Sequence, residues 1–374
     1  MILSTHARPP GKTSLNNYLF MNLFFYLGSC QFSFTPMVTY AVNAGPVGIA
    51  TGDFNDDNQT DVVVTNFNNE TISVLLSYGN GSFTEQKTFS TGRYPNSVVV
   101  ADFNNDNRLD IVVANWGDST ISILLGYGNG SFATQTVLFA NSNPYWVAVG
   151  EFNNDNLPDL VVINEFSNNT GVYLGDGNGS FTVRTTFLTG YEPLGAVVSD
   201  FNGDNRSDIA VANSGDNTIS ILLGYGNGSF ATQKTFLTGN TPRSIAIGDF
   251  NEDKKIDLVV ANFINNSVSV LFGFGNGTFS TQILLSTDSY PNAVAVGDLN
   301  GDNRKDIVVT NCNGNNTSVF IAFDNGSFTS QITFAAGVCP SGVALGDFNG
   351  DGRQDVAISN NANANIGILL SICQ

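Results

Sequence analysis

Short runs of apolar, β-branched residues alternate with polar turn sequences along most of the chain, and the pattern repeats every 49 residues. In the second copy the runs are residues 97–101, 110–114, 121–125 and 132–139. They lack the 3.6-residue spacing of an amphipathic helix, and Gly- and Asn-rich segments separate them. Each repeat is therefore predicted to form a four-stranded antiparallel sheet. A period of 40 to 50 residues is typical of solenoids and propellers.

The two ends of the repeat predict a closed ring. Residues 34–41 have the phase of a fourth strand but lack the three strands before it, and the last copy stops after its third run at residues 366–370. An N-terminal strand that completes the last sheet accounts for both ends. The predicted fold is all-β, a seven-bladed β-propeller of four-stranded antiparallel blades, with the last blade closed by the N-terminal strand. Residues 30–374 form this domain.

Residues 1–29 differ in kind from the repeats. Three basic or histidine side chains precede an apolar stretch at residues 18–27 that ends in small residues. Ten residues cannot span a bilayer but suit the apolar core of a signal peptide. We therefore expect a secreted protein with no membrane span in the mature chain.

An acidic loop follows the first run of every repeat. The first copy reads Asp-Phe-Asn-Asp-Asp-Asn-Gln-Thr-Asp over residues 53–61, with oxygen-bearing side chains at loop positions one, three, five and nine. This spacing lets a chain wrap a hard cation; Ca²⁺ tolerates the geometry better than Mg²⁺, and no His or Cys cluster suggests zinc. Up to seven Ca²⁺ ions are predicted. The predicted ligands are Asp53, Asn55, Asp57, Asp61, Asp102, Asn104, Asp106, Asp110, Glu151, Asn153, Asp155, Asp159, Asp200, Asn202, Asp204, Asp208, Asp249, Asn251, Asp253, Asp257, Asp298, Asn300, Asp302, Asp306, Asp347, Asn349, Asp351 and Asp355.

The charge of the chain is concentrated in these loops. Loop positions one, five and nine hold 21 of the 32 acidic residues, and seven divalent cations would offset 14 of the 18 net negative charges. Metal binding and folding are therefore expected to be coupled. The third loop begins with the longer Glu151, and Lys254 and Lys255 bring cations into the fifth, so these two sites should bind most weakly. The alternative is that the loops are Asx turns that cap themselves without metal.

The four cysteines are placed as two pairs. Cys30 and Cys373 differ by seven periods and would nearly superpose in a closed ring. Cys312 and Cys339 lie in loops that an up-and-down blade puts on the same face. Both predicted bridges, Cys30–Cys373 and Cys312–Cys339, imply an oxidising compartment.

The acidic loop, the Gly-Tyr-Gly-Asn-Gly-Ser-Phe turn and the Tyr-Pro-Asn start of the first strand resemble the FG-GAP/VCBS repeat family, which includes the integrin α-subunit propeller. The resemblance covers roughly residues 31–374. It implies calcium held through loop positions one, three, five and nine together with the backbone carbonyl of position seven. Integrin propellers keep such loops in only some blades, whereas all seven copies are legible in this chain.

The repeats differ most in the loops opposite the acidic ones. Both tryptophans of the chain map there, and Trp146 has core packing as its alternative because it adjoins an apolar strand. Aromatic side chains beside charges are typical of a protein- or sugar-binding patch. The candidate ligand-face residues are Tyr94, Trp116, Tyr145, Trp146 and Phe166.

Composition argues for binding rather than catalysis. The only histidine, His6, lies in the leader, and 14 basic residues without a run do not suit nucleic acid. We expect a monomeric, non-catalytic binding or adhesion module, glycosylated at sites such as Asn69, that recognises an extracellular protein or glycan. The alternatives are a lectin with pockets between blades and, less favoured, a polysaccharide-active enzyme using Glu165 and Glu192.

Overall fold

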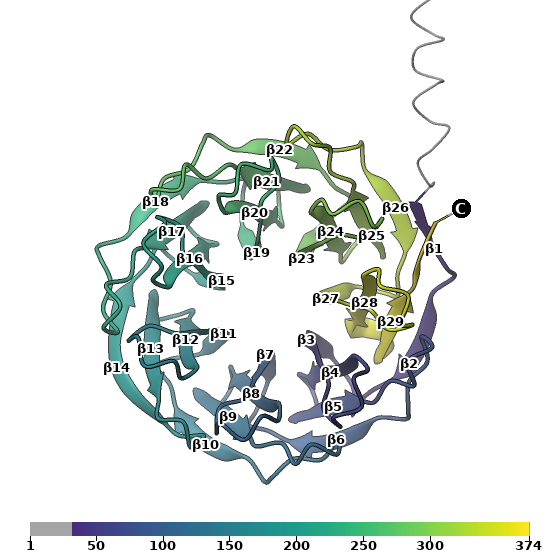
Figure 1. Ribbon diagram of the computed structural model, residues 1–374, viewed down its shortest axis with the longest axis horizontal. Helices are drawn as coiled ribbons and strands as arrows, with labels where there is room; N and C mark the ends of the chain where they lie inside the picture. Colours follow the sequence, from purple (N-terminus) through teal and green to yellow (C-terminus); the bar gives the residue numbers. More distant parts are fainter. Residues whose placement is uncertain (1–31, 374) are drawn as a thin grey trace, which may run out of the picture.

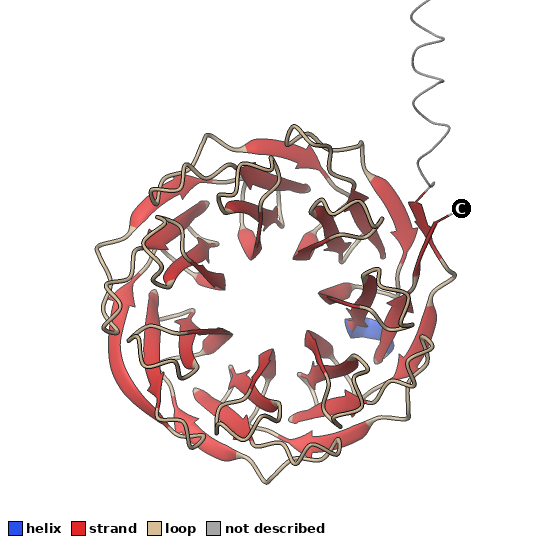
Figure 2. Ribbon diagram, in the orientation of Figure 1, coloured by secondary structure: helices blue, strands red, loops and turns tan. Residues whose placement is uncertain are grey.

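The computed structural model describes residues 32–373 as seven four-stranded antiparallel sheets arranged around a central channel (Figures 1 and 2). This confirms the predicted seven-bladed propeller. Within these residues, no helix has the length and apolar character needed to cross a membrane. The predicted signal peptide at residues 1–29 lies outside the described part of the chain.

In each complete blade the first strand lies nearest the channel and the fourth forms the outer edge (Figure 1). The strands of blades one to three are β3 (Pro46–Gly52), β4 (Asp61–Asn66), β5 (Thr71–Leu75), β6 (Lys87–Ser90), β7 (Pro95–Ala101), β8 (Asp110–Asn115), β9 (Thr120–Leu124), β10 (Thr136–Phe139), β11 (Pro144–Gly150), β12 (Asp159–Asn164), β13 (Asn169–Gly175) and β14 (Phe181–Leu188). Those of blades four to six are β15 (Pro193–Ser199), β16 (Asp208–Asn213), β17 (Thr218–Leu222), β18 (Lys234–Leu237), β19 (Pro242–Gly248), β20 (Asp257–Asn262), β21 (Ser267–Leu271), β22 (Ile283–Ser286), β23 (Pro291–Gly297), β24 (Asp306–Asn311), β25 (Asn316–Phe320) and β26 (Ile332–Ala335).

The seventh blade joins the two ends of the chain, as predicted. β2 (Val38–Ala41) pairs with β29 (Asn365–Leu369), which follows β27 (Pro340–Gly346) and β28 (Asp355–Asn360). The single N-terminal strand expected at residues 34–41 is in fact two strands. β1 (Phe32–Phe34) forms a separate pair with β30 (Ser371–Cys373), because a break before Val38 lets the chain step from one partner to the next.

The hydrophobic core consists of seven clusters, and each lies between two neighbouring blades. One cluster, for example, combines Val63 and Val74 of blade one with Val98, Ile111 and Val113 of blade two. The second strand of every blade is buried along its whole length. A blade alone would expose both faces, so ring closure is what buries the core.

A phenylalanine at loop position two links each acidic loop to the next blade. Phe54 packs edge-on against Phe132 of the following blade with ring centroids 5.7 Å apart, and its carbonyl accepts the Gly130 N–H at 2.8 Å. Leu299 replaces phenylalanine in the sixth repeat and packs with Phe34 of the N-terminal strand. The loop therefore positions its own blade and the neighbouring one together.

The predicted disulfide between Cys312 and Cys339 is confirmed. It joins the β24–β25 loop to the link between β26 and β27, on the face opposite the acidic loops. The other predicted bridge includes Cys30, which lies outside the described residues. The backbone brings Phe32 opposite Cys373 in the β1–β30 pair.

The closure of the ring predicts the effect of one core substitution. Phe34 is 8% exposed and contacts Phe334 with ring centroids 4.7 Å apart, whereas Phe139 on β10 is 78% exposed. Phe34→Ala should lower the free energy of unfolding by about 3–5 kcal/mol, the range for a buried phenylalanine, and Phe139→Ala should change it little. Denaturant unfolding of both variants measures this. Equal effects would show that the N-terminal strand does not stabilise the ring.

Candidate functional site

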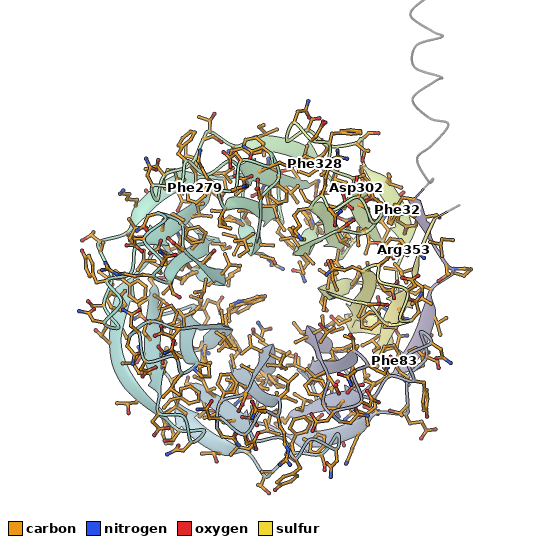
Figure 3. The ribbon with its side chains drawn as sticks, in the orientation of Figure 1. Phe32, Phe83, Phe279, Asp302, Phe328 and Arg353 are labelled. Atoms are coloured by element: carbon orange, nitrogen blue, oxygen red, sulfur yellow. A yellow bond between two sulfur atoms is a disulfide. The ribbon has the colours of Figure 1, made fainter. Side chains whose placement is uncertain are left out.

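The seven acidic loops join the first strand of each blade to the second and lie on the same face as the Gly-Asn-Gly turns. Figure 3 places Asp302 and Arg353, from two of these loops, well outward of the channel. Gly130 of one such turn donates its N–H to Phe54 in the acidic loop of the preceding blade. The loops therefore form a connected belt on one face.

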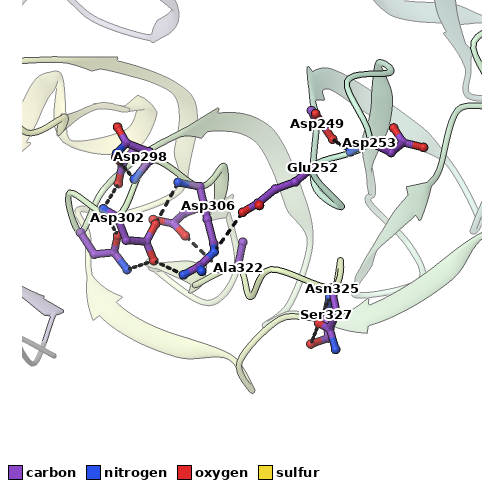
Figure 4. A network of polar contacts seen from close by, with 12 residues as sticks. Asp249, Glu252, Asp253, Asp298, Asp302, Asp306, Ala322, Asn325 and Ser327 are labelled. Carbon is purple, nitrogen blue, oxygen red and sulfur yellow. Dashed lines mark hydrogen bonds and ion pairs between the residues drawn. The ribbon is translucent and has the colours of Figure 1, made fainter. Parts of the chain in front are cut away.

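Each loop is wrapped around the side chain at position one. In the sixth loop, Asp298 Oδ1 accepts the N–H groups of Gly301 at 2.7 Å and Asp302 at 3.1 Å, and its Oδ2 accepts that of Asn303 at 2.7 Å (Figure 4). Positions four and six both adopt the left-handed conformation, with φ of 78° at Gly301 and 66° at Asn303. Asparagine or glycine occupies position six in six of the loops, and even Lys254, at this position in the fifth, has φ 63°. The left-handed conformation at position four is not evident from the sequence, because Asp, Asn, Glu and Gly all occupy this position.

The third loop departs from this pattern because its first side chain, Glu151, is one methylene longer than an aspartate. Glu151 accepts the amides of Asn153, Asn154 and Asp155 through Oε1 alone. In the other loops the second carboxylate oxygen accepts the N–H of position six. The second carboxylate oxygen of Glu151 therefore does not accept the N–H of position six, unlike that of the aspartates.

The aspartate at position nine is buried in all seven loops. Asp306 accepts the N–H of Leu299 at 3.0 Å through one oxygen and that of Ala322 at 2.9 Å through the other. The same two bonds recur in every blade, so this side chain ties the start of the loop to the end of the third strand. Among the side chains that the structure describes, no ion pair includes a position-nine aspartate. Each loop thus holds a desolvated carboxylate without a counter-charge.

Basic side chains at position seven contact the carboxylate at position five. Arg304 Nη1 lies 3.2 Å from Asp302 Oδ2, and its Nε lies 3.2 Å from Glu252 Oε1 of the neighbouring loop (Figure 4). Arg108, Arg206, Lys255 and Arg353 occupy equivalent places. A cation near the site is therefore not peculiar to the fifth loop, where sequence reasoning placed it. These pairs are solvent-exposed and contribute little to stability.

The donor set of the loops suits a hard divalent cation. Each loop offers three carboxylates and one amide oxygen, and Asn55 Oδ1 is buried without a hydrogen-bond partner. In the described conformation the carboxylates accept backbone amides, and among residues 32–373 no three acidic, histidine or cysteine side chains are grouped so as to hold a metal ion. Metal binding would therefore require these side chains to turn toward a common point.

The opposite face carries the largest differences between the repeats, and many of these lie in two rings around the channel mouth. Every blade has a proline at the start of its first strand, paired with a buried asparagine at the end of its second. The residue after each proline forms the inner ring and the residue after each asparagine the outer ring. The inner ring is Val47, Asn96, Tyr145, Leu194, Arg243, Asn292 and Ser341; the outer ring is Phe67, Trp116, Glu165, Ser214, Phe263, Cys312 and Asn361.

The inner ring owes its position to a bulge. The strand register shifts between Pro95 and Ser97, so Asn96 has no direct partner on β8. A register shift follows the proline of every blade, and in blade one it extends to Ile49. Bulges re-aim a side chain without ending the strand. The fixed proline and asparagine thus hold two variable side chains in each blade.

The two rings enclose a cavity of about 500 Å³ at the channel mouth. All its lining residues belong to the rings except Asn68 and Cys339. A narrower cavity of about 80 Å³ continues from it along the channel, lined by Trp146 and by small residues such as Ser244 and Gly342 at the equivalent position. A cavity of several hundred Å³ with aromatic walls and a few polar groups is typical of a ligand site.

The structure brings most of the predicted ligand-face residues together. Trp116 is half-buried, and its indole Nε1–H donates to Glu165 Oε2 at 2.6 Å. Tyr94 and Phe166, both exposed, approach the Trp116 ring with centroids 6.2 and 5.9 Å away. Tyr145 lines the cavity from the inner ring. These side chains form a continuous surface over blades one to three.

Trp146 is placed apart from this group. It is half-buried, packs against the core between blades three and four, and lines the narrow part of the channel. The core-packing alternative therefore describes it better than the ligand patch. Phe67, which stacks on Tyr94 at 4.8 Å, was missed although it lies one period before Trp116.

The position-nine aspartates predict an unusual pH dependence for the metal-free protein. Burial raises the pKa of Asp61, Asp159, Asp208 and Asp257 to about 6 and that of Asp306 to about 7, from 3.8. The folded state then binds more protons than the unfolded state between these values, so the unfolding free energy falls as pH rises through this window. EDTA-treated protein should melt at a higher temperature at about pH 5 than at about pH 7. Thermal scans test this, and Asp306→Asn should reduce the difference; a higher melting temperature at pH 7 would contradict it.

Comparison with known proteins places the chain in a family. A family model described as an FG-GAP-like repeat matches residues 53–113, 102–162, 151–211, 200–260, 249–309 and 304–358 in turn. None of the curated proteins compared with the chain matched it.

Solved propellers share the fold at low sequence identity. BBS1N, solved in complex with ARL6DN, superposes with a TM-score of 0.65 at 14% identity, covering 91% of this chain and 97% of that one. A catalytically inactive virginiamycin B lyase from Staphylococcus aureus, solved with quinupristin, has a TM-score of 0.60 at 16% identity, covering 91% and 99%. A functionally unknown protein from Desulfotomaculum acetoxidans has a TM-score of 0.56 at 16% identity, covering 84% and 89%. The six consecutive repeat matches confirm the resemblance seen in the sequence: this chain belongs to the FG-GAP-like repeat family.

Proposed function

We propose that this protein is a secreted, non-catalytic binding module that recognises an extracellular partner through the two rings at the channel mouth. One observation carries the proposal. Every repeat has the same residue types at its proline, asparagine and acidic positions, while the residues that line the mouth differ from blade to blade. Positions free of a scaffold role are where an asymmetric recognition surface can be built.

Three further observations support a protein partner outside the cell. Tyr94, Phe166 and Tyr191 are exposed aromatic side chains near the mouth, and such residues are enriched at the centres of protein interfaces. The Cys312–Cys339 disulfide suits an oxidising compartment. BBS1N, a propeller of the same fold, was solved with a protein partner.

Calcium is proposed for the acidic loops on the opposite face. The side chains at positions one, three, five and nine, which in loop six are Asp298, Asn300, Asp302 and Asp306, would hold the ion. Bound calcium would supply the counter-charge that the buried position-nine carboxylate lacks. Because this loop also contacts the next blade, metal binding would stiffen the junction between blades rather than take part in a reaction.

Removal of metal gives a direct test of the calcium proposal. Each occupied site adds about 2.7 kcal/mol to the unfolding free energy when free calcium is about 100 times its Kd. EDTA should therefore lower the melting temperature markedly, and added calcium should restore it. Differential scanning calorimetry in both conditions measures the shift. An unchanged melting curve would contradict structural calcium and favour loops that cap themselves.

Two substitutions in loop six separate metal ligation from hydrogen bonding. Asn300→Ala should reduce the gain on adding calcium but change the melting temperature in EDTA only slightly, because its two hydrogen bonds with Asp302 are exposed to solvent. Asp306→Asn should lower stability even in EDTA, by about 1–3 kcal/mol, because one buried N–H loses its acceptor. The same calorimetric series compares them. Similar behaviour of the two variants would show that position nine has no metal-independent role.

The binding face can be assigned by paired substitutions on the two faces. We would screen the calcium-loaded protein against a library of displayed extracellular proteins and a glycan array. Trp116→Ala or Phe166→Ala should weaken any specific binding at least about tenfold, as expected for an interface anchor. Tyr225→Ala, exposed in a Gly-Tyr-Gly turn on the other face, is the control. Binding lost only in Tyr225→Ala would overturn the assignment.

A lectin remains the second candidate because one cavity does lie between blades. It measures about 540 Å³ and is lined by Thr39, Tyr40 and Ala41 of the N-terminal strand and by residues 83–86 of blade one. Glycan binding there would respond to Tyr40→Ala and not to Trp116→Ala. The glycan array with these two variants separates the two functions.

A further inference from the structure

Arg243 is an exception in the electrostatics of this acidic chain. Arg93, Arg108, Arg206 and Arg353 each form an ion pair with an aspartate. Arg243 takes part in no ion pair among residues 32–373, although the chain has a net charge of −18. A guanidinium that stays without a carboxylate in such a chain is placed to meet one from outside.

The Arg243 side chain is held in a fixed orientation in the cavity at the channel mouth. Its guanidinium carbon lies 3.4 Å from the centre of the Phe263 ring, and Nη1 donates to Asn292 Oδ1 at 3.1 Å. Phe263 in turn stacks on Tyr290 at 4.7 Å. Nε is buried and has no hydrogen-bond partner. The group is thus oriented by an aromatic face and an amide, with donor capacity left over.

Glu165 supplies the opposite charge to the same cavity. Oε2 accepts the Trp116 indole N–H at 2.6 Å, which fixes the carboxylate against an aromatic wall. No ion pair among the described residues includes Glu165, so Glu165 and Arg243 attract each other across the cavity without direct contact. Burial raises the pKa of Glu165 and so does the nearby charge of Glu192, whereas the Trp116 hydrogen bond and the charge of Arg243 partly offset this rise. Both side chains line the cavity, from blades three and five.

These charges select for a ligand that carries both signs. Each desolvated charge is unfavourable until it meets an opposite charge with good geometry. A neutral sugar would leave both charges unpaired, and a simple anion or cation would leave one. Phe67, Trp116, Tyr145 and Phe263 give the cavity apolar walls between its polar groups. Aromatic faces also attract an ammonium ion that lies against them.

We propose that the channel mouth binds a small zwitterion with an apolar body, such as an α-amino acid with an aromatic or aliphatic side chain. Arg243 holds its carboxylate, and Glu165 together with the Trp116 face holds its ammonium group. This ligand site is additional to the proposed recognition of a protein partner, and its existence does not depend on that function. Electrostatic complementarity at two separate points gives selectivity against ligands that match only one.

Three related probes test the proposal on the intact protein. L-phenylalanine carries both charges, 3-phenylpropionate only the carboxylate and phenethylamine only the ammonium, on similar apolar bodies. Isothermal titration calorimetry should show L-phenylalanine binding at least about tenfold more tightly than either analogue, because each loses one charge pair. Equal binding of all three, or no binding of L-phenylalanine at millimolar concentration, would overturn the proposal. This comparison needs no variant and so does not depend on a substitution folding correctly.

Substitutions then assign each charge to its residue. Arg243→Gln should abolish the advantage of L-phenylalanine over phenethylamine, and Glu165→Gln should abolish its advantage over 3-phenylpropionate. Arg93→Gln is the matched control, because Arg93 lies on the same face but is paired with Asp118 at 2.6 Å. Melting curves check that each variant is folded. Arg243→Lys, which keeps the positive charge, is a second substitution at this position. An effect of Arg93→Gln equal to that of Arg243→Gln would contradict the assignment.

Discussion

The buried aspartate at loop position nine is the constraint on which the rest of this propeller depends. In every blade it accepts one amide from the start of the acidic loop and one from the end of the third strand. A carboxylate offers two acceptor oxygens and no donor, so an asparagine would leave one buried N–H opposed by another. The residue that gives the first N–H is the one whose ring packs on the next blade. One side chain therefore sets both the geometry within a blade and the contact between blades.

This arrangement divides the two faces of the disc by role. Loop positions one, two, three, five and nine of the acidic face are nearly constant, because each loop must satisfy the same backbone groups and meet the same neighbour. On the other face, only the proline and the asparagine of each blade are needed to hold the strands, and the bulge after the proline releases one side chain toward the channel. Seven copies of one scaffold thus support fourteen ring positions that are free to differ. The asymmetry of the site arises from substitution at equivalent positions, without any insertion.

Much of the structure followed from periodicity. The strand runs, the seven blades, the split last blade and the Cys312–Cys339 bridge were predicted because a repeat fixes which segments share a phase. The errors were local. The N-terminal segment is two strands because β1 finds a partner in the C-terminal tail, which no repeat contains. The left-handed residue at loop position four was missed because four residue types occupy it, and non-glycine residues rarely adopt that conformation.

The sequence by itself determined the architecture and the location of the acidic loops. The spacing of apolar residues, the turn residues and the position of each residue within the 49-residue repeat can all be read along the chain. It also indicated which face varies. Only the tertiary structure decided how the variable residues combine. Trp116 and Glu165 are one period apart, yet ring closure brings them within hydrogen-bonding distance. Arg243, from a different blade, reaches the same cavity. Such contacts depend on the curvature of the ring and on the bulges, which linear spacing does not specify.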